Sequence, residues 1–241
     1  MKKLFFLTLL LFVLACGKHN KTLDKLEQIK TVGDENPKLA ITMLDSLTHA
    51  VREEDEYTQM KYDLLSIRLH DKNYDVATSD KDIKRVAKYF EEKGSDVEKQ
   101  EAYHYAGSVY RDLEDNPRAL EYFLKSADIS KKEEVDTNLL CNTYSNLAQI
   151  YIDLKDFDQG KNAALTELRL CQHLHDSGIV ALDHLLCCYD RLDSIDATKY
   201  YGEKLLVCCQ TIPDENVYKI NTLYNLLVDF CHINDSVNAC K

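Results

Sequence analysis

Apolar and small side chains recur at helical spacing along most of the chain, in segments separated by short polar stretches. The spacing predicts five helix pairs and a last helix, over residues 22–31 with 37–51, 55–71 with 79–93, 97–113 with 117–131, 135–154 with 157–174, 177–191 with 195–210, and 214–232. The polar stretch 71–80 is predicted to be a long loop that caps or contacts something.

The segments also resemble one another. The best-formed unit carries aromatic and small residues at Tyr103, Gly107, Tyr110, Ala119, Phe123 and Ser126. Related positions recur as Tyr144, Ala148, Tyr151, Phe157 and Gly160, and more weakly as Leu185, Cys188, Ala197 and Tyr201. The phrase Glu35-Asn36-Pro37-Lys38 returns as Asp115-Asn116-Pro117-Arg118. A pattern of residues that recurs in this way along the chain indicates stacked supersecondary units.

This pattern resembles the tetratricopeptide repeat (TPR), a helix–turn–helix unit that is stretched here beyond its usual length. Two positions depart from the family signature, since Ala106 stands for a leucine and Lys131 for the closing proline. The resemblance implies an all-α fold, a right-handed α–α superhelix or TPR-like solenoid, over residues 22–241. One helix pair cannot bury its apolar face alone, so the units are expected to stack.

Small residues are expected where the two helices of a unit cross at close range. Gly107, Ala148 and Ser66 meet this need on the first helix, and Ala119, Ala197 and Gly160 on the second. Asn116 is predicted to cap a helix that begins at Pro117.

Composition supports helices and limits the range of functions. The 241 residues include only seven glycines and three prolines, too few turn-forming residues for a many-stranded sandwich or barrel. The net charge of −11 repels phosphate backbones, so nucleic-acid binding is not expected.

The amino terminus resembles a bacterial lipoprotein signal. A basic start precedes the apolar run 4–15, which is too short to span a bilayer but fits a signal-peptide core. Val13-Leu14-Ala15-Cys16 resembles a lipobox, although Leu14 is bulkier than usual. The resemblance implies a signal peptide over 1–15, acylation of Cys16 and a lipid-anchored tether over 16–21. An ordinary secretory signal is the alternative. The residues after Cys16 favour the periplasmic face of the outer membrane within the cell envelope.

Eight further cysteines leave disulfides and a metal site open. Cys187 and Cys208 would be offset by nine residues along an antiparallel pair, beyond disulfide reach, which favours cysteines used as small hydrophobic residues. Cys171 and His175 could converge on a helix, but two ligands do not make a zinc site. No metal, cofactor or catalytic motif is predicted, so the chain is not expected to be an enzyme.

In the TPR family, partners usually lie in the concave groove lined by the first helix of each unit. Transferring those positions predicts a partner-binding groove of mixed charge, rich in amides, formed by Glu101, His104, Ser108, Arg111, Asp112, Asn142, Ser145, Gln149, Ile152 and Asp153. Such a groove suits a protein or peptide partner, and simple exposure to solvent is the alternative.

Three functions follow from these observations. The first is a lipid-anchored scaffold for protein–protein interactions on the periplasmic side of the envelope. The others are the sensory ectodomain of a membrane-bound transcriptional regulator, and a component of outer-membrane assembly. The apolar stripe Leu223, Leu226, Leu227 and Phe230 is expected to cap the stack, to mediate self-association or partner binding, or to precede the continuation of a longer protein.

Overall fold

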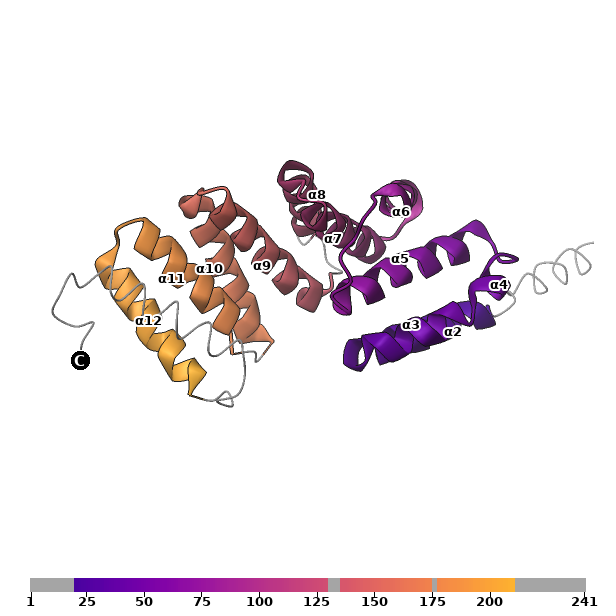
Figure 1. Ribbon diagram of the computed structural model, residues 1–241, viewed down its shortest axis with the longest axis horizontal. Coiled ribbons are helices and arrows are strands. Elements are labelled where there is room, and N and C mark those ends of the chain that lie inside the picture. The colour runs from indigo at the N-terminus through magenta and orange to yellow at the C-terminus, as the bar shows by residue number, and fades with distance from the viewer. Residues whose placement is uncertain (1–19, 130–134, 175–176, 211–241) are drawn as a thin grey trace, which may run out of the picture. The chain divides into compact units, whose positions relative to one another are not determined.

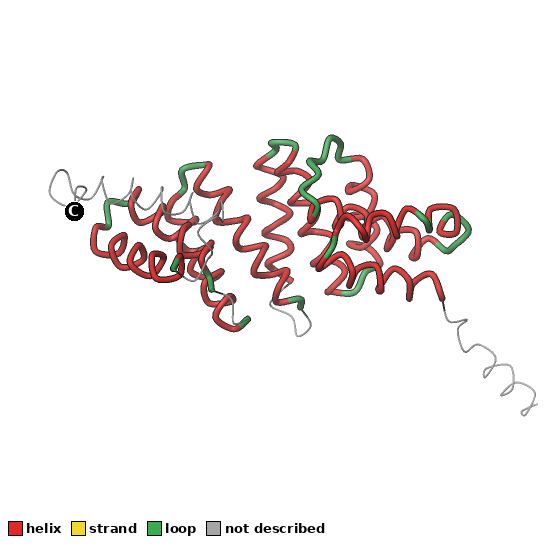
Figure 2. The backbone as a smooth tube through the Cα atoms, turned by 60° about the horizontal axis from the view of Figure 1, so that its bottom comes forward, coloured by secondary structure: helices red, strands yellow, loops and turns green. Residues whose placement is uncertain are grey.

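The computed structural model describes residues 20–129, 135–174 and 177–210. These residues form helices and connecting loops and contain no strand (Figure 2). The chain divides into two compact units at Asp75 and Val76. Cys16, the predicted signal peptide and the predicted helix 214–232 lie outside the described residues.

The first unit contains α2 (Lys21–Glu35), α3 (Pro37–Asp45), α4 (Thr48–Val51) and α5 (Glu56–Lys72) (Figure 1). Asn20 caps α2, and Asn36 caps α3 by accepting a hydrogen bond from the Leu39 amide at 3.0 Å. A core of buried aliphatic residues joins these helices, made of Leu26, Ile29, Ala40, Leu44, Leu47, Val51, Leu65 and Leu69.

The predicted helix 37–51 is interrupted between α3 and α4. The Ser46 hydroxyl donates to the Met43 carbonyl at 2.6 Å, and the Thr48 hydroxyl donates to the Asp45 carbonyl at 2.8 Å. Short polar side chains compete in this way with backbone hydrogen bonds, so the interruption has a local cause.

The second unit contains α6 (Lys81–Lys93), α7 (Asp96–Asp112), α8 (Asn116–Ile129), α9 (Thr137–Asp153), α10 (Phe157–His173), α11 (Ile179–Arg191) and α12 (Ile195–Cys209). Short turns join α7 to α8, α9 to α10 and α11 to α12, so each of these pairs runs antiparallel (Figure 1). Its main core includes the fully buried Phe123, Ala119, Ala148 and Leu185. Ala119 and Ala148 therefore occupy the buried small-residue positions that the repeat pattern predicts.

The start of α8 differs from the prediction by one residue. Asn116 is the first helical residue, and the Asp115 carboxylate accepts from the Arg118 amide at 3.1 Å. Asp115 also accepts from the Arg118 guanidinium at 2.7 Å. An aspartate is as good an N-cap as asparagine, and here its carboxylate also binds the Arg118 side chain.

Within the described residues, four helices end in the same turn, which contains no glycine. The residue after the cap is Tyr74, Glu114, Lys155 or Asp193, with φ angles of 60°, 58°, 61° and 53°. After α7, the Asp115 amide donates to the Tyr110 carbonyl and the Glu114 amide donates to the Arg111 carbonyl, both at 2.9 Å. This hydrogen-bond pair defines the Schellman motif, in which the left-handed residue is usually glycine.

Candidate functional site

The predicted groove residues of α7 are largely buried. Glu101, His104 and Ser108 expose 5%, 4% and 1% of their surface, because α7 is covered on all sides between Gln100 and Tyr110. Buried side chains cannot contact a partner directly. The predicted partner-binding surface therefore loses these three residues in this conformation.

His104 belongs instead to a buried polar network. Its Nδ1 lies 2.8 Å from the Thr143 hydroxyl, which itself donates to the Leu139 carbonyl at 2.8 Å. Because the threonine proton is used in that second bond, His104 Nδ1 is the donor. Ser126 donates to the Gln100 carbonyl at 3.0 Å, which ties α8 to α7. The polar groups of this network form hydrogen bonds between helices, so few of them are available to bind a ligand.

Arg111 and Asp112 are less buried and hold neighbouring segments. Arg111 donates to the Asn146 side chain at 2.7 Å and to the Asp112 carboxylate at 2.9 Å. Asp112 also accepts from the Ala77 amide at 3.1 Å. The polar stretch 71–80 therefore contacts α7 within the second unit.

The remaining predicted residues lie along one face of α9. Asn142, Gln149 and Asp153 are exposed, and Ser145 and Ile152 are half-buried. The Gln149 side chain donates to the Asp153 carboxylate at 2.8 Å. Residues three and four positions apart share a helix face, so the polar members of this set form a continuous polar strip, made of Asn142, Ser145, Gln149 and Asp153.

A pocket of about 290 Å³ opens at the start of this strip, and we call it the polar pocket. It lies among α9, α10 and the start of α11, and its lining residues are Asn138, Cys141, Asn142, Ser145, Glu167, Cys171, Leu174, Gly178 and Val180. Two predicted groove residues, Asn142 and Ser145, thus share a pocket with Cys171, which was considered as a metal ligand from the sequence, and with Glu167, which was not singled out.

Glu167 brings a carboxylate to the wall of the polar pocket. Its Oε2 lies 3.1 Å from Nδ1 of His184 on α11, and the two side chains expose only 3% and 8% of their surface. A buried carboxylate needs such a partner, because loss of hydration is costly for an isolated charge. Burial also raises the pKa of the Asp183 carboxyl beside His184 in the chain, while the charge of His184 opposes that rise.

The sequence carried a signal for Glu167. It lies in a helical stripe of buried small residues, which also contains Gly160, Ala163, Ala164 and Cys171. An acidic residue within an apolar stripe indicates a buried, paired carboxylate. The partner could not be identified in this way, because His184 belongs to another helix.

Cys141 and Cys171 face each other at the same pocket. Their Sγ atoms lie 3.2 Å apart, and both side chains are buried. Cys141 Sγ also lies 3.9 Å from the Glu167 carbonyl.

The expectation that cysteines pack as small hydrophobic residues fits Cys188 and Cys209, which expose 0% and 1% of their surface.

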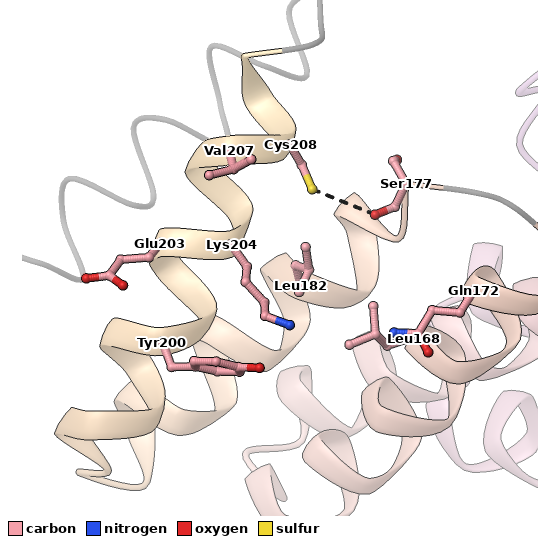
Figure 3. A pocket seen from close by; sticks show the side chains of 9 residues that line it. All are labelled: Leu168, Gln172, Ser177, Leu182, Tyr200, Glu203, Lys204, Val207 and Cys208. Carbon is pink, nitrogen blue, oxygen red and sulfur yellow. Dashed lines mark hydrogen bonds between the residues drawn. The ribbon is translucent and has the colours of Figure 1, made fainter.

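A second pocket, of about 430 Å³, is lined mainly by apolar groups between α10, α11 and α12 (Figure 3). Leu168 and Leu182 lie on one side, and Tyr200 and Val207 on the other. The Lys204 ammonium lies 4.7 Å from the centre of the Tyr200 ring. No residue predicted for the groove lines this pocket.

Within residues 20–129, 135–174 and 177–210, no group of three or more histidine, cysteine or acidic side chains could hold a metal ion. His175, the second ligand in the zinc alternative, lies outside these ranges. In the same part of the chain, no helix combines the length and the apolar character needed to cross a membrane.

Comparison with solved structures relates the chain to helical repeat proteins. BtubC (BKLC) from P. vanneervenii aligns with a TM-score of 0.60 and 14% identity, covering 88% of this chain and 81% of that one. A putative kinesin light chain with TPR-like repeats from Podosopora anserina aligns with a TM-score of 0.62 and 11% identity, covering 78% and 92%. A single-residue variant of that protein aligns with a TM-score of 0.63, at the same identity and coverage. The chain has a TPR-like fold.

At these identities, the likeness shows the fold alone. No protein-family model matches the sequence, and no curated protein sequence matches it either. The all-α solenoid predicted from the repeat pattern is confirmed by the helices of the structure and by these neighbours.

Proposed function

We propose that this chain is a non-catalytic, lipid-anchored scaffold on the periplasmic side of the cell envelope, where its polar pocket binds an extended segment of a partner protein. The TPR-like fold is consistent with a protein-interaction scaffold. The anchor and the location rest on the lipobox-like sequence that ends at Cys16.

The arrangement of amide side chains at the polar pocket carries the proposal for binding. Asn138 and Asn142 line the pocket together with the half-buried Ser145. Each amide both donates and accepts hydrogen bonds, and a hydroxyl does the same, which matches the alternating N–H and C=O groups of an extended peptide. Glu167 Oε2 lies 3.1 Å from His184 Nδ1, so this carboxyl oxygen already has a hydrogen-bond partner within the protein.

The pocket size limits what enters it. A volume of about 290 Å³ lies at the lower end for a small-molecule site, so it suits one or two side chains of a larger partner. The polar strip continues from the pocket along α9 through Gln149 to Asp153. The peptide backbone would follow this strip.

Site-specific photo-crosslinking tests the partner surface. A photoreactive amino acid at Ser145 should crosslink a distinct protein in cells, whereas the same group at the exposed Glu121 on α8 should not. Asn142→Ala should then weaken binding of the identified partner segment. Equal crosslinking at both positions, or none at Ser145, would contradict the proposed surface.

Cell fractionation tests the anchor separately. Cys16→Ser should move the protein from the membrane fraction to the soluble fraction, with accumulation of unprocessed precursor. Cys187→Ser is the matched control and should leave the protein with the membrane. Unchanged membrane association of the Cys16→Ser variant, without precursor, would refute lipidation but would leave the pocket proposal standing.

A further inference from the structure

The Cys141–Cys171 contact stands out among the cysteines of the described residues. Both residues line the polar pocket, and their Sγ atoms are 3.2 Å apart. A disulfide bond is about 2.05 Å long, so small rotations about the two Cα–Cβ bonds would bring the sulfurs to bonding distance. The pair comes from α9 and α10, which pack side by side in the core of the second unit.

The register of these helices explains why the two sulfurs meet. Cys141 precedes the turn residue Lys155 by 14 positions, and Cys171 follows it by 16. In an antiparallel pair, this difference of two residues is an axial offset of roughly 3 Å, which side chains can span. The equivalent offset for Cys187 and Cys208 is much larger, so helix register distinguishes the first pair from the second.

We propose that Cys141 and Cys171 are a modification site at which an intramolecular disulfide forms by exchange with a low-molecular-weight or protein disulfide. One thiol loses its proton, and its sulfur attacks the external disulfide to give a mixed disulfide and one thiolate. The second protein thiol also loses its proton, and its sulfur displaces the remaining external thiolate. The two protons end on the two released thiols, so the protein is oxidised and the external disulfide is reduced.

The polar pocket gives a reagent its route to the sulfurs. Cys141 and Cys171 expose 8% and 5% of their surface and line a pocket of about 290 Å³. The exchange does not depend on the proposed scaffold function. The two ideas are compatible, because an exported chain meets an oxidising compartment.

Oxidised glutathione on the purified full-length protein tests the site. After acid quenching and alkylation, peptide mapping should show a peptide containing Cys141 joined to one containing Cys171, with loss of two hydrogens. The oxidised protein should melt on the order of 5–10 °C higher than the reduced protein, because the bond restricts the unfolded chain between these residues.

Matched variants separate this pair from the other cysteines. Cys141→Ser and Cys171→Ser should each abolish the joined peptide and the melting shift, whereas Cys187→Ser and Cys208→Ser should retain both. Glutathione adducts on Cys141 or Cys171 without a bond between them would overturn the proposal. Two unmodified thiols after prolonged exposure would also overturn the proposal. Both results are measured on the unsubstituted protein, so they do not depend on whether a variant folds.

Discussion

The Phe123 ring lies directly against the backbone of Gly107. A Cβ atom built on Gly107 would stand only 2.6 Å from Cδ1 of Phe123 and 2.7 Å from its Cε1 and Cγ. Phe123 is fully buried in the core of the second unit. The close crossing of α7 and α8 therefore depends on the missing side chain at Gly107, as the repeat pattern predicts.

Replacing this glycine should destabilise the second unit. Gly107→Val is expected to lower the free energy of unfolding by about 1–3 kcal/mol, because a branched side chain would overpack the crossing. Urea unfolding followed by circular dichroism measures the change, with the exposed Glu121→Val as the control. Adding Phe123→Leu to Gly107→Val should restore part of the lost free energy of unfolding. If it restores none, contact with the Phe123 ring is not the cause of the destabilisation.

A glycine should be favourable at the left-handed turn residues. Lys155 has a φ angle of 61°, which costs an L-residue more than it costs glycine. Lys155→Gly is therefore expected to raise the free energy of unfolding by about 0.5–1 kcal/mol, after the entropy loss of glycine is included. Leu154→Gly, one residue earlier at a φ of −78°, is the control and should destabilise the protein. Equal changes in the free energy of unfolding for the two variants, measured with urea, would show that the left-handed backbone at Lys155 is not strained.

Acid should weaken the ion pairs at Asp34. Burial alone would raise the pKa of Asp34, but hydrogen bonds from Lys72 at 2.7 Å and Arg68 at 2.6 Å outweigh it and lower the pKa. A lowered pKa stabilises the folded state above the ordinary value of 3.8, and the gain is lost as pH falls through the folded-state value. Because Asp34 is half exposed, the gain is only about 0–1 kcal/mol.

Asp34→Asn should therefore destabilise the protein at pH 7, and the difference from wild type should shrink below about pH 4. Urea unfolding at several pH values measures this convergence. Glu35→Gln, at the exposed neighbouring position, serves as the control. A difference that persists unchanged at low pH would show that the carboxylate charge is not responsible.

Cys188 should react slowly with alkylating agents. Burial raises the pKa of its thiol to about 12, from an ordinary value of 9.0. At pH 8, the reactive thiolate would then be only about one part in ten thousand. Iodoacetamide labelling of the Cys187→Ser variant, followed by mass spectrometry, should show Cys188 protected until urea is added. Labelling at the same rate with and without urea would contradict this.

Much of the fold was predictable because helix boundaries have local causes. The segment 97–113 was expected where the structure has Asp96–Asp112, since Ser95 starts that helix with a capping box. The interruption at Ser46 was missed, because serine and threonine hydroxyls can turn either to solvent or to the backbone.

The candidate site was harder to predict, because it depends on how three helices pack. Family positions placed His104 in an open groove, whereas the structure buries it against Thr143 on another helix. Asn142 and Ser145 come from the same transfer of family positions and line the polar pocket, and their contact with a partner stays a prediction. The Cys141–Cys171 contact follows from helix register, but only once the turn between the helices is located.

The four glycine-free turns suggest where the chain can be cut and rejoined. Glu114 and Lys155 have φ angles within a few degrees of each other, and the same two hydrogen bonds form around each. Tyr74, Glu114, Lys155 and Asp193 follow one another at separations of 40, 41 and 38 positions. Deleting the stretch from Glu114 to Lys155 would leave a joint with nearly the same φ angle and the same hydrogen-bond pattern, so the backbone at the joint would not oppose shortening the second unit by two helices.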